Sequence, residues 1–214
     1  LSAFRIRMPH ELLLHQDIYD EFMEKLVRRT KSLKLGDTLD PDTQMGSLIS
    51  KDQVKKVDGY VKEAVKNGAK LACGGQQYTQ PPCDKGNYYL PTILENVENT
   101  MKCAREEIFG PVLVVMKYRS LDEAIAMAND NQYALGATIW SEDPKTLFYA
   151  SKKVDAGIVW LNTNVMSKIE APYGGNKNSG LGREDGTIGI KEYLKVKNNV
   201  LYTAREYDNF YGFS

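Results

Sequence analysis

The fold class is indicated most clearly by residues 111–162, PVLVVMKYRSLDEAIAMANDNQYALGATIWSEDPKTLFYASKKVDAGIVWLN. This stretch begins with a nearly continuous apolar run, which is typical of a strand buried on both faces. Two helices are predicted within it, because Ser120 and Glu123 form a capping box and Asp143 precedes Pro144 as an N-cap. ALGATIWS and IVWLN are predicted strands. This alternation predicts an α/β fold, with a largely parallel twisted sheet, right-handed crossovers and helices on both faces.

Two amphipathic helices are predicted upstream of this stretch. In HQDIYDEFMEKLVRRTKSLKLG, the apolar residues Ile18, Phe22 and Leu26 recur at helical spacing. Ser50 and Gln53 form a further capping box, and the helix that they begin is predicted to end at an Asn-Gly pair. Both helices are expected to pack one apolar face on the sheet.

The remaining segments give weaker signals. Residues 1–14 are expected to be irregular, whereas KLACGG (70–75) and NYYLPTILENV (87–97) have extended character. A helix is predicted near TIGIKEYL (187–194), followed by a last strand, NNVLYTA (198–204). The final residues carry four aromatic side chains, so they are expected to pack on another surface.

Composition excludes several function classes. Lys and Arg number 28, as do Asp and Glu, so no net charge favours nucleic acid or an anionic membrane.

No apolar run approaches the roughly 18 residues of a membrane span, and a cytoplasmic location is expected. Cys73, Cys83 and Cys103 lack the spacing of a zinc site, so free thiols and no metal are predicted. The chain begins at Leu1 and is expected to be a fragment.

Two motifs suggest a ligand site. EEIFGPV (106–112) places two carboxylates at a glycine-proline turn before a buried strand, although such a pair is often only a solvated turn. YGGNKNSGLGRE (173–184) is rich in glycine, but it has neither a Walker lysine-serine pair nor a G-x-G-x-x-G after a strand. It is therefore predicted to be a tight structural loop rather than a phosphate cradle.

Four segments in register, REEIFGPVLVVMKY, ALGATIWSED, AGIVWLN and YGGNKNSGLGRE, make the chain similar to the aldehyde dehydrogenase superfamily from about Asp17 to about Val200. The resemblance is to the C-terminal, catalytic-domain portion of these NAD(P)-dependent enzymes, which convert aldehydes into carboxylic acids. It implies a catalytic-domain-like region at 1–196, with an atypical lead-in at 1–14, and a C-terminal oligomerisation strand and aromatic tail at 197–214.

The resemblance implies contacts with NAD or NADP. Glu107 would bind the nicotinamide ribose, since a carboxylate can accept hydrogen bonds from two vicinal hydroxyls, and the Phe109 ring would restrain the nicotinamide. Gln53 and Lys56 would reach the adenosine side of the cofactor, although Gln53 is also the capping-box residue and Lys56 could be an ordinary exposed charge. Glu106 is expected to be structural.

The segment after VWLN corresponds, by the same resemblance, to the loop that lines the aldehyde tunnel. Asn164, Met166, Ser167 and Tyr173 are therefore candidates for substrate contact. The alternative is that Tyr173 packs structurally in a surface loop. Asn162 is expected to support the backbone rather than bind a ligand.

The chemical step of this family needs a thiolate nucleophile and a glutamate base. The position of the cysteine falls on Ile6, or on Leu1 if LSA matches the CSA of relatives, so no catalytic nucleophile is predicted. The base and the dinucleotide-binding domain are expected upstream. The chain is therefore predicted to be inactive alone and not to hold the cofactor stably.

Two hypotheses follow. In the first, the chain is a catalytic-domain portion of an aldehyde dehydrogenase, whose partners are a small aldehyde and either a second copy or a complementing N-terminal half. In the second, it is a non-catalytic interaction module that oligomerises through NNVLYTA by edge-strand addition.

Overall fold

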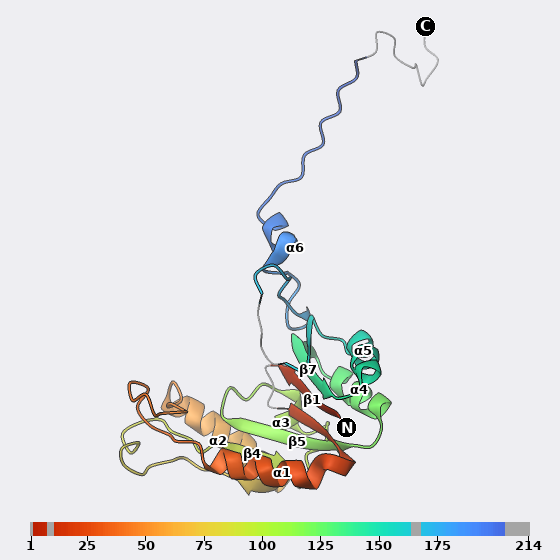
Figure 1. Cartoon of the computed structure of the whole chain (residues 1–214). Coiled ribbons are helices and arrows are strands. Elements are labelled where there is room, and N and C mark those ends of the chain that lie inside the picture. Colours follow the sequence, from red (N-terminus) through yellow and green to blue (C-terminus); the bar gives the residue numbers. More distant parts are fainter. Residues whose placement is uncertain (1, 8–10, 164–167, 204–214) are drawn as a thin grey trace.

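The computed structural model describes residues 2–7, 11–163 and 168–203, with only the backbone of residues 2–7 (Figure 1). Its centre is a seven-stranded sheet. In order across the sheet, the strands are β3 (Lys70–Cys73), β4 (Thr92–Glu95), β5 (Val112–Tyr118), β2 (Glu11–His15), β1 (Ser2–Arg7), β7 (Gly136–Ser141) and β8 (Ile158–Leu161).

The sheet is mostly parallel. β4, β5 and β2 pair in parallel, as do β7 and β8. β1 pairs antiparallel with both β2 and β7, so β2 and β7 run in the same direction. Five of the seven strands, β4, β5, β2, β7 and β8, therefore run the same way. The antiparallel strand β3 forms one edge of the sheet.

Six helices and a small second sheet complete the described part of the chain. The helices are α1 (Gln16–Lys31), α2 (Lys51–Lys66), α3 (Lys102–Arg105), α4 (Leu121–Asn129), α5 (Pro144–Lys153) and α6 (Gly186–Lys191). The short strands β6 (Tyr133–Ala134) and β9 (Asn176–Lys177) pair antiparallel. No helix in the described ranges is long and apolar enough to cross a bilayer.

Both faces of the sheet are covered by helices, as predicted. Leu12 and Leu14 of β2 pack in one buried cluster with Tyr19 and Met23 of α1. Leu13, which points to the opposite face, belongs to a larger cluster that also contains residues of α2, α4 and α5. Successive residues of a strand point to opposite faces, so this single strand contributes to both cores.

The predicted helix starts are confirmed. The Ser50 hydroxyl accepts a hydrogen bond from the Gln53 N–H at 3.1 Å, and the Ser120 hydroxyl accepts one from the Glu123 N–H at 3.2 Å. The Asp143 carboxylate accepts from two N–H groups in the first turn of α5. Each cap satisfies backbone donors that have no partner within the helix.

Three expectations need correction. Residues 2–7 and 11–15 are not irregular, because they form β1 and β2 in the middle of the sheet. On α1, Ile18 and Leu26 pack against a buried cluster as predicted, but Phe22 is 37% exposed. Tyr19 and Met23 are the buried residues of this helix. Residues 198–203 form no strand; they extend away from the body of the molecule (Figure 1), and the tail beyond residue 203 lies outside the described residues.

Candidate functional site

The turn between α3 and β5 presents two of the predicted ligand residues. Ile108 is fully buried and anchors the turn in the main core, whereas Phe109 is 64% exposed. Phe109 has φ 55°, a left-handed conformation that is rare for a residue with a bulky side chain. Burial raises the pKa of the half-buried Glu107 carboxyl, and the attraction of the Lys56 ammonium partly offsets this.

Helix α2 brings the other two predicted cofactor residues to the same turn. Lys56 Nζ lies 5.6 Å from the centre of the Phe109 ring and 5.8 Å from that of Tyr60. Gln53 Nε2 donates to the backbone carbonyls of Ile108 and Phe109 at 3.0 and 2.9 Å. The four residues predicted from sequence therefore converge at one place, although the amide hydrogens of Gln53 are already engaged by the turn.

Glu106 has a structural contact. The Tyr60 hydroxyl donates to Glu106 Oε2 at 2.6 Å, which links α2 to the start of the turn. Burial and the neighbouring Glu106 carboxylate raise the pKa of Tyr60 to about 12, so the hydroxyl remains a donor at neutral pH. Glu106 thus has the structural contact that was expected of it.

The substrate-loop candidates are only partly described. Asn164, Met166 and Ser167 lie outside the described residues. The Tyr173 N–H and C=O bond the C=O and N–H of Glu184, both at 2.7 Å, within the glycine-rich loop. Asn162 supports the backbone, since its side chain exchanges two hydrogen bonds of 2.9 Å with the main chain of Ser141.

The glycine-rich loop is held by its own side chains. Lys177 Nζ donates to the carbonyls of Asn129 and Asn131 at 2.8 and 3.1 Å and lies 3.3 Å from Asp155 Oδ2. Arg183 donates to Gly175 O at 2.6 Å. With these cations engaged by carbonyls and a carboxylate, the loop is a tight structural loop, as predicted.

No thiol is placed as a nucleophile within the described ranges. All three cysteines are free and buried, and burial raises the pKa of Cys103 to about 11. A thiol with such a pKa is almost fully protonated at neutral pH and is a poor nucleophile. Of the two candidate nucleophile positions, Ile6 lies in β1 opposite Ala137 of β7, and Leu1 lies outside the described residues.

Glu11 is a buried carboxyl that the sequence did not predict. Glu11, at the start of β2, is 4% exposed, and its Oε1 accepts a hydrogen bond from Asn131 at 3.1 Å. Burial raises its pKa to about 7, although the nearby Arg105 guanidinium lowers it. The only signal in the sequence is one acidic residue directly before an apolar run, which is common at exposed strand ends.

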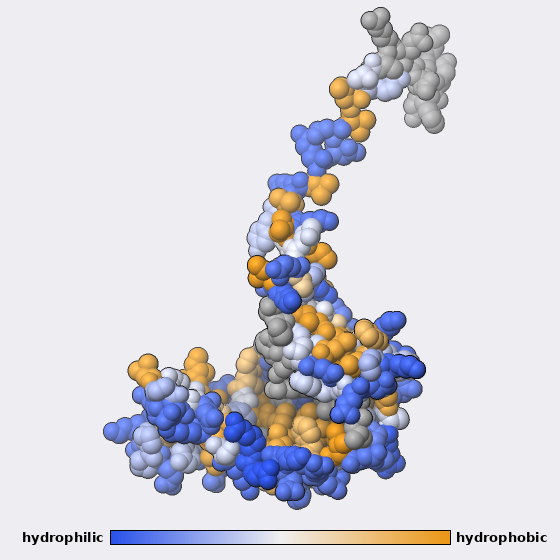
Figure 2. Space-filling view, viewed as in Figure 1, coloured by the Kyte–Doolittle hydropathy of each residue, from blue (hydrophilic) through white to orange (hydrophobic). Residues whose placement is uncertain are grey.

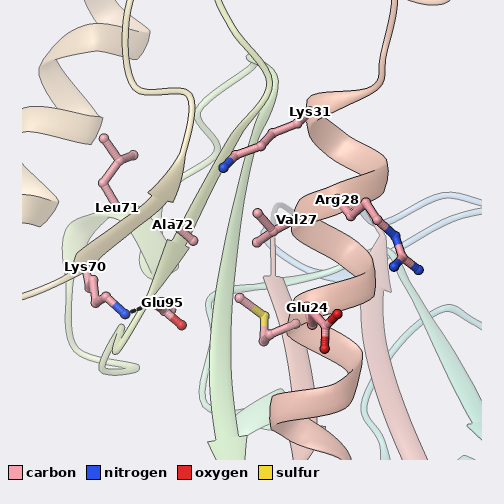
Figure 3. A pocket seen from close by; sticks show the side chains of 9 residues that line it. Glu24, Val27, Arg28, Lys31, Lys70, Leu71, Ala72 and Glu95 are labelled. Carbon is pink, nitrogen blue, oxygen red and sulfur yellow. Dashed lines mark ion pairs between the residues drawn. The ribbon is translucent and has the colours of Figure 1, made fainter.

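A separate groove of about 530 Å³ lies between α1 and β3, on the face of the sheet opposite α2. Met23 and Val27 line its α1 side, and the Lys31 ammonium projects across it toward β3 (Figure 3). At the lower end, Lys70 and Glu95 pair at 2.6 Å. Among the residues predicted for cofactor or substrate, none of those that the structure describes lines this groove.

Comparison with known proteins identifies the relatives of the chain. The sequence model of the aldehyde dehydrogenase family matches residues 8–199. The betaine aldehyde dehydrogenase of Brucella melitensis biotype 2 (strain ATCC 23457) is 40% identical over 186 residues, which are 87% of this chain and 38% of that protein. The chain thus spans well under half the length of the curated relatives that it matches.

Solved structures agree with the sequence match. Betaine aldehyde dehydrogenase from Staphylococcus aureus in complex with NAD+ superposes with a TM-score of 0.89 at 35% identity, over 94% of this chain and 40% of that one. A variant of the aldehyde dehydrogenase from Bacillus cereus superposes with a TM-score of 0.84 at 36% identity, over 88% and 38% of the two chains. These likenesses confirm the predicted α/β fold.

Proposed function

Since this chain belongs to the aldehyde dehydrogenase family, we propose that it is the catalytic-domain portion that holds the nicotinamide ribose in an NAD(P)-dependent enzyme converting aldehydes into carboxylic acids. The observation that carries the proposal is the convergence of Glu107, Phe109 and Lys56 at one turn. Packing gives no reason for a 64% exposed aromatic ring at a left-handed position, whereas presentation to a ligand does.

The residues at this turn fit a nicotinamide ribose. The ionised Glu107 carboxylate has only acceptor atoms, so it suits a pair of ribose hydroxyls that donate. The exposed Phe109 ring offers a flat apolar surface that restrains the orientation of a planar group. When bound, the nicotinamide supplies the hydride acceptor of the reaction. Burial raises the pKa of Glu107, and the Lys56 ammonium partly offsets this effect because it attracts the ionised carboxylate.

We further propose that these 214 residues do not oxidise aldehydes by themselves. An aliphatic side chain at Ile6 or Leu1 cannot attack a carbonyl, and the buried thiol of Cys103 is protonated. The general base and the dinucleotide-binding domain are assigned to the part of the relatives that this chain does not span. NAD or NADP held only at the turn would therefore bind weakly.

Two measurements on the purified chain test these proposals. Nicotinamide riboside should shift the NMR signals of residues 107–109, and Glu107→Gln should weaken that binding because the neutral amide is a poorer acceptor. An unchanged spectrum at saturating riboside would refute the ribose site. Separately, NAD-linked and NADP-linked oxidation of betaine aldehyde and acetaldehyde should equal a no-protein blank, and turnover above it would refute the proposed inactivity.

A second candidate function rests on the C-terminal segment. Val196, Val200 and Leu201 are almost fully exposed in an extended stretch (Figure 2) that leaves the body of the molecule. Exposed apolar residues in an extended segment favour edge-strand addition to another chain. A homo-oligomer on gel filtration that dissociates when residues 198–214 are deleted would support this interaction role. A monomer at high concentration would exclude it.

A further inference from the structure

We propose that helix α2 clamps the turn at 106–110 and that Gln53 acts as a positioning residue for Phe109. The proposal concerns how the turn is held, and it rests on the proposed function only where the ligand is concerned. It adds a positioning role to the cofactor contact that resemblance implies for Gln53. The clamp consists of Gln53, Val57 and Tyr60, which recur at i, i+4 and i+7 on one face of α2.

The first contact fixes the backbone on both sides of Phe109. Gln53 Nε2 donates to Ile108 O at 3.0 Å and to Phe109 O at 2.9 Å. The first carbonyl belongs to the peptide unit before Phe109, and the second belongs to the unit after it. Because φ and ψ of Phe109 are the rotations of these two units about its α-carbon, one amide group restrains both angles.

The restrained residue has an unfavourable backbone conformation. Phe109 has φ 55°, a region that a side chain with a β-carbon disfavours, so the turn would relax to negative φ without an external partner. The two bonds require both hydrogens of the Gln53 amide, which leaves only its oxygen for any other partner. A side chain committed in this way orients the turn.

Two further contacts press the turn onto α2. A β-carbon at Gly110 would overlap Val57, so only glycine allows the backbone to approach the helix this closely. The Tyr60 hydroxyl donates to Glu106 at 2.6 Å. Glu106 and Gly110 are thus tied to α2 at the two ends of the turn, and Gln53 holds its middle.

The testing variant is Gln53→Glu, which keeps the shape of the side chain and suits the first turn of a helix. It replaces the NH₂ donor with an acceptor that faces two carbonyls. The matched control is Lys55→Gln, on the exposed side of the same helix. Should Gln53→Glu fail to fold, Gln53→Leu removes the donors without adding charge.

The first readout is backbone ¹⁵N relaxation of residues 107–110 without ligand. At pH 7.5, Gln53→Glu should lower the order parameters of Ile108, Phe109 and Gly110 while those of the α2 interior stay unchanged. At a pH low enough to protonate the introduced carboxyl, it can donate one hydrogen bond, so part of the rigidity should return. A turn that stays as rigid as in the parent chain at both pH values would overturn the clamp.

The second readout is the affinity for nicotinamide riboside, followed by chemical shifts. Gln53→Glu should weaken binding at least tenfold, and Lys55→Gln should leave it within twofold. Weakened binding with a rigid turn would show that Gln53 contacts the ligand, which would refute the positioning role. If the parent chain binds no riboside, the proposed function fails, yet the relaxation experiment still decides the clamp.

Discussion

Replacing Glu11 with Gln should remove most of the pH dependence of stability between pH 5 and 8. The folded chain raises the pKa of this carboxyl from 4.5 to about 7, chiefly through burial at the start of β2. Between these values the folded protein keeps a proton that the unfolded chain has released. The free energy of unfolding therefore falls as pH rises through this range, and levels off above about pH 7.

The magnitude follows from the difference between the two pKa values. Each pH unit between them corresponds to about 1.4 kcal/mol, so the ionised carboxylate costs roughly 3 kcal/mol at pH 8 relative to pH 4.5. In Glu11→Gln, the amide oxygen can still accept the hydrogen bond from Asn131. The variant should match the parent near pH 5 and exceed its stability by about 2–3 kcal/mol at pH 8.

Urea unfolding followed by the fluorescence of Trp140 and Trp160 measures this difference. The matched control is Glu24→Gln on the exposed side of α1, whose stability should follow the parent curve at every pH. Curves for the parent chain and Glu11→Gln that stay parallel from pH 5 to 8 would refute the reasoning. They would mean that the carboxyl is hydrated or fully compensated by the Arg105 guanidinium.

Three other results are expected. Lys177→Met removes contacts to two carbonyls and to Asp155, so urea titration should show a free energy of unfolding lower by about 1–3 kcal/mol. An unchanged midpoint would contradict the role of this side chain in the glycine-rich loop. Gly157→Ala places a β-carbon against the carbonyl oxygen of Gly174. Thermal unfolding should therefore show a stability lower by about 1–3 kcal/mol, whereas the same change at an open site usually raises stability. The three buried thiols should react with a disulfide reagent far more slowly in the native chain than in urea, and complete labelling of native protein within the mixing time would show that they are accessible.

Local signals in the sequence predicted the local structure well. The caps at Ser50, Ser120 and Asp143 join residues two or three positions apart, so the pattern of residue types is sufficient to locate them. The apolar run that became β5 is buried on both faces, as its composition indicates. The strand predicted at the C-terminal end did not form in residues 198–203. A strand there needs a second strand to pair with, and the sequence of the segment does not specify one.

Patterns of residues were sufficient to predict the α/β class and the helix starts, and resemblance supplied the residues of the candidate site. The folded chain was needed to see that β1 and β2 lie at the centre of the sheet, that Glu11 is buried and that Gln53 is engaged by the turn. The reason is separation along the chain: Glu11 and Asn131 are 120 residues apart, and Gln53 and Phe109 are 56 apart. Which side chains meet over such distances depends on how the sheet and helices pack, and periodicity carries no information about it.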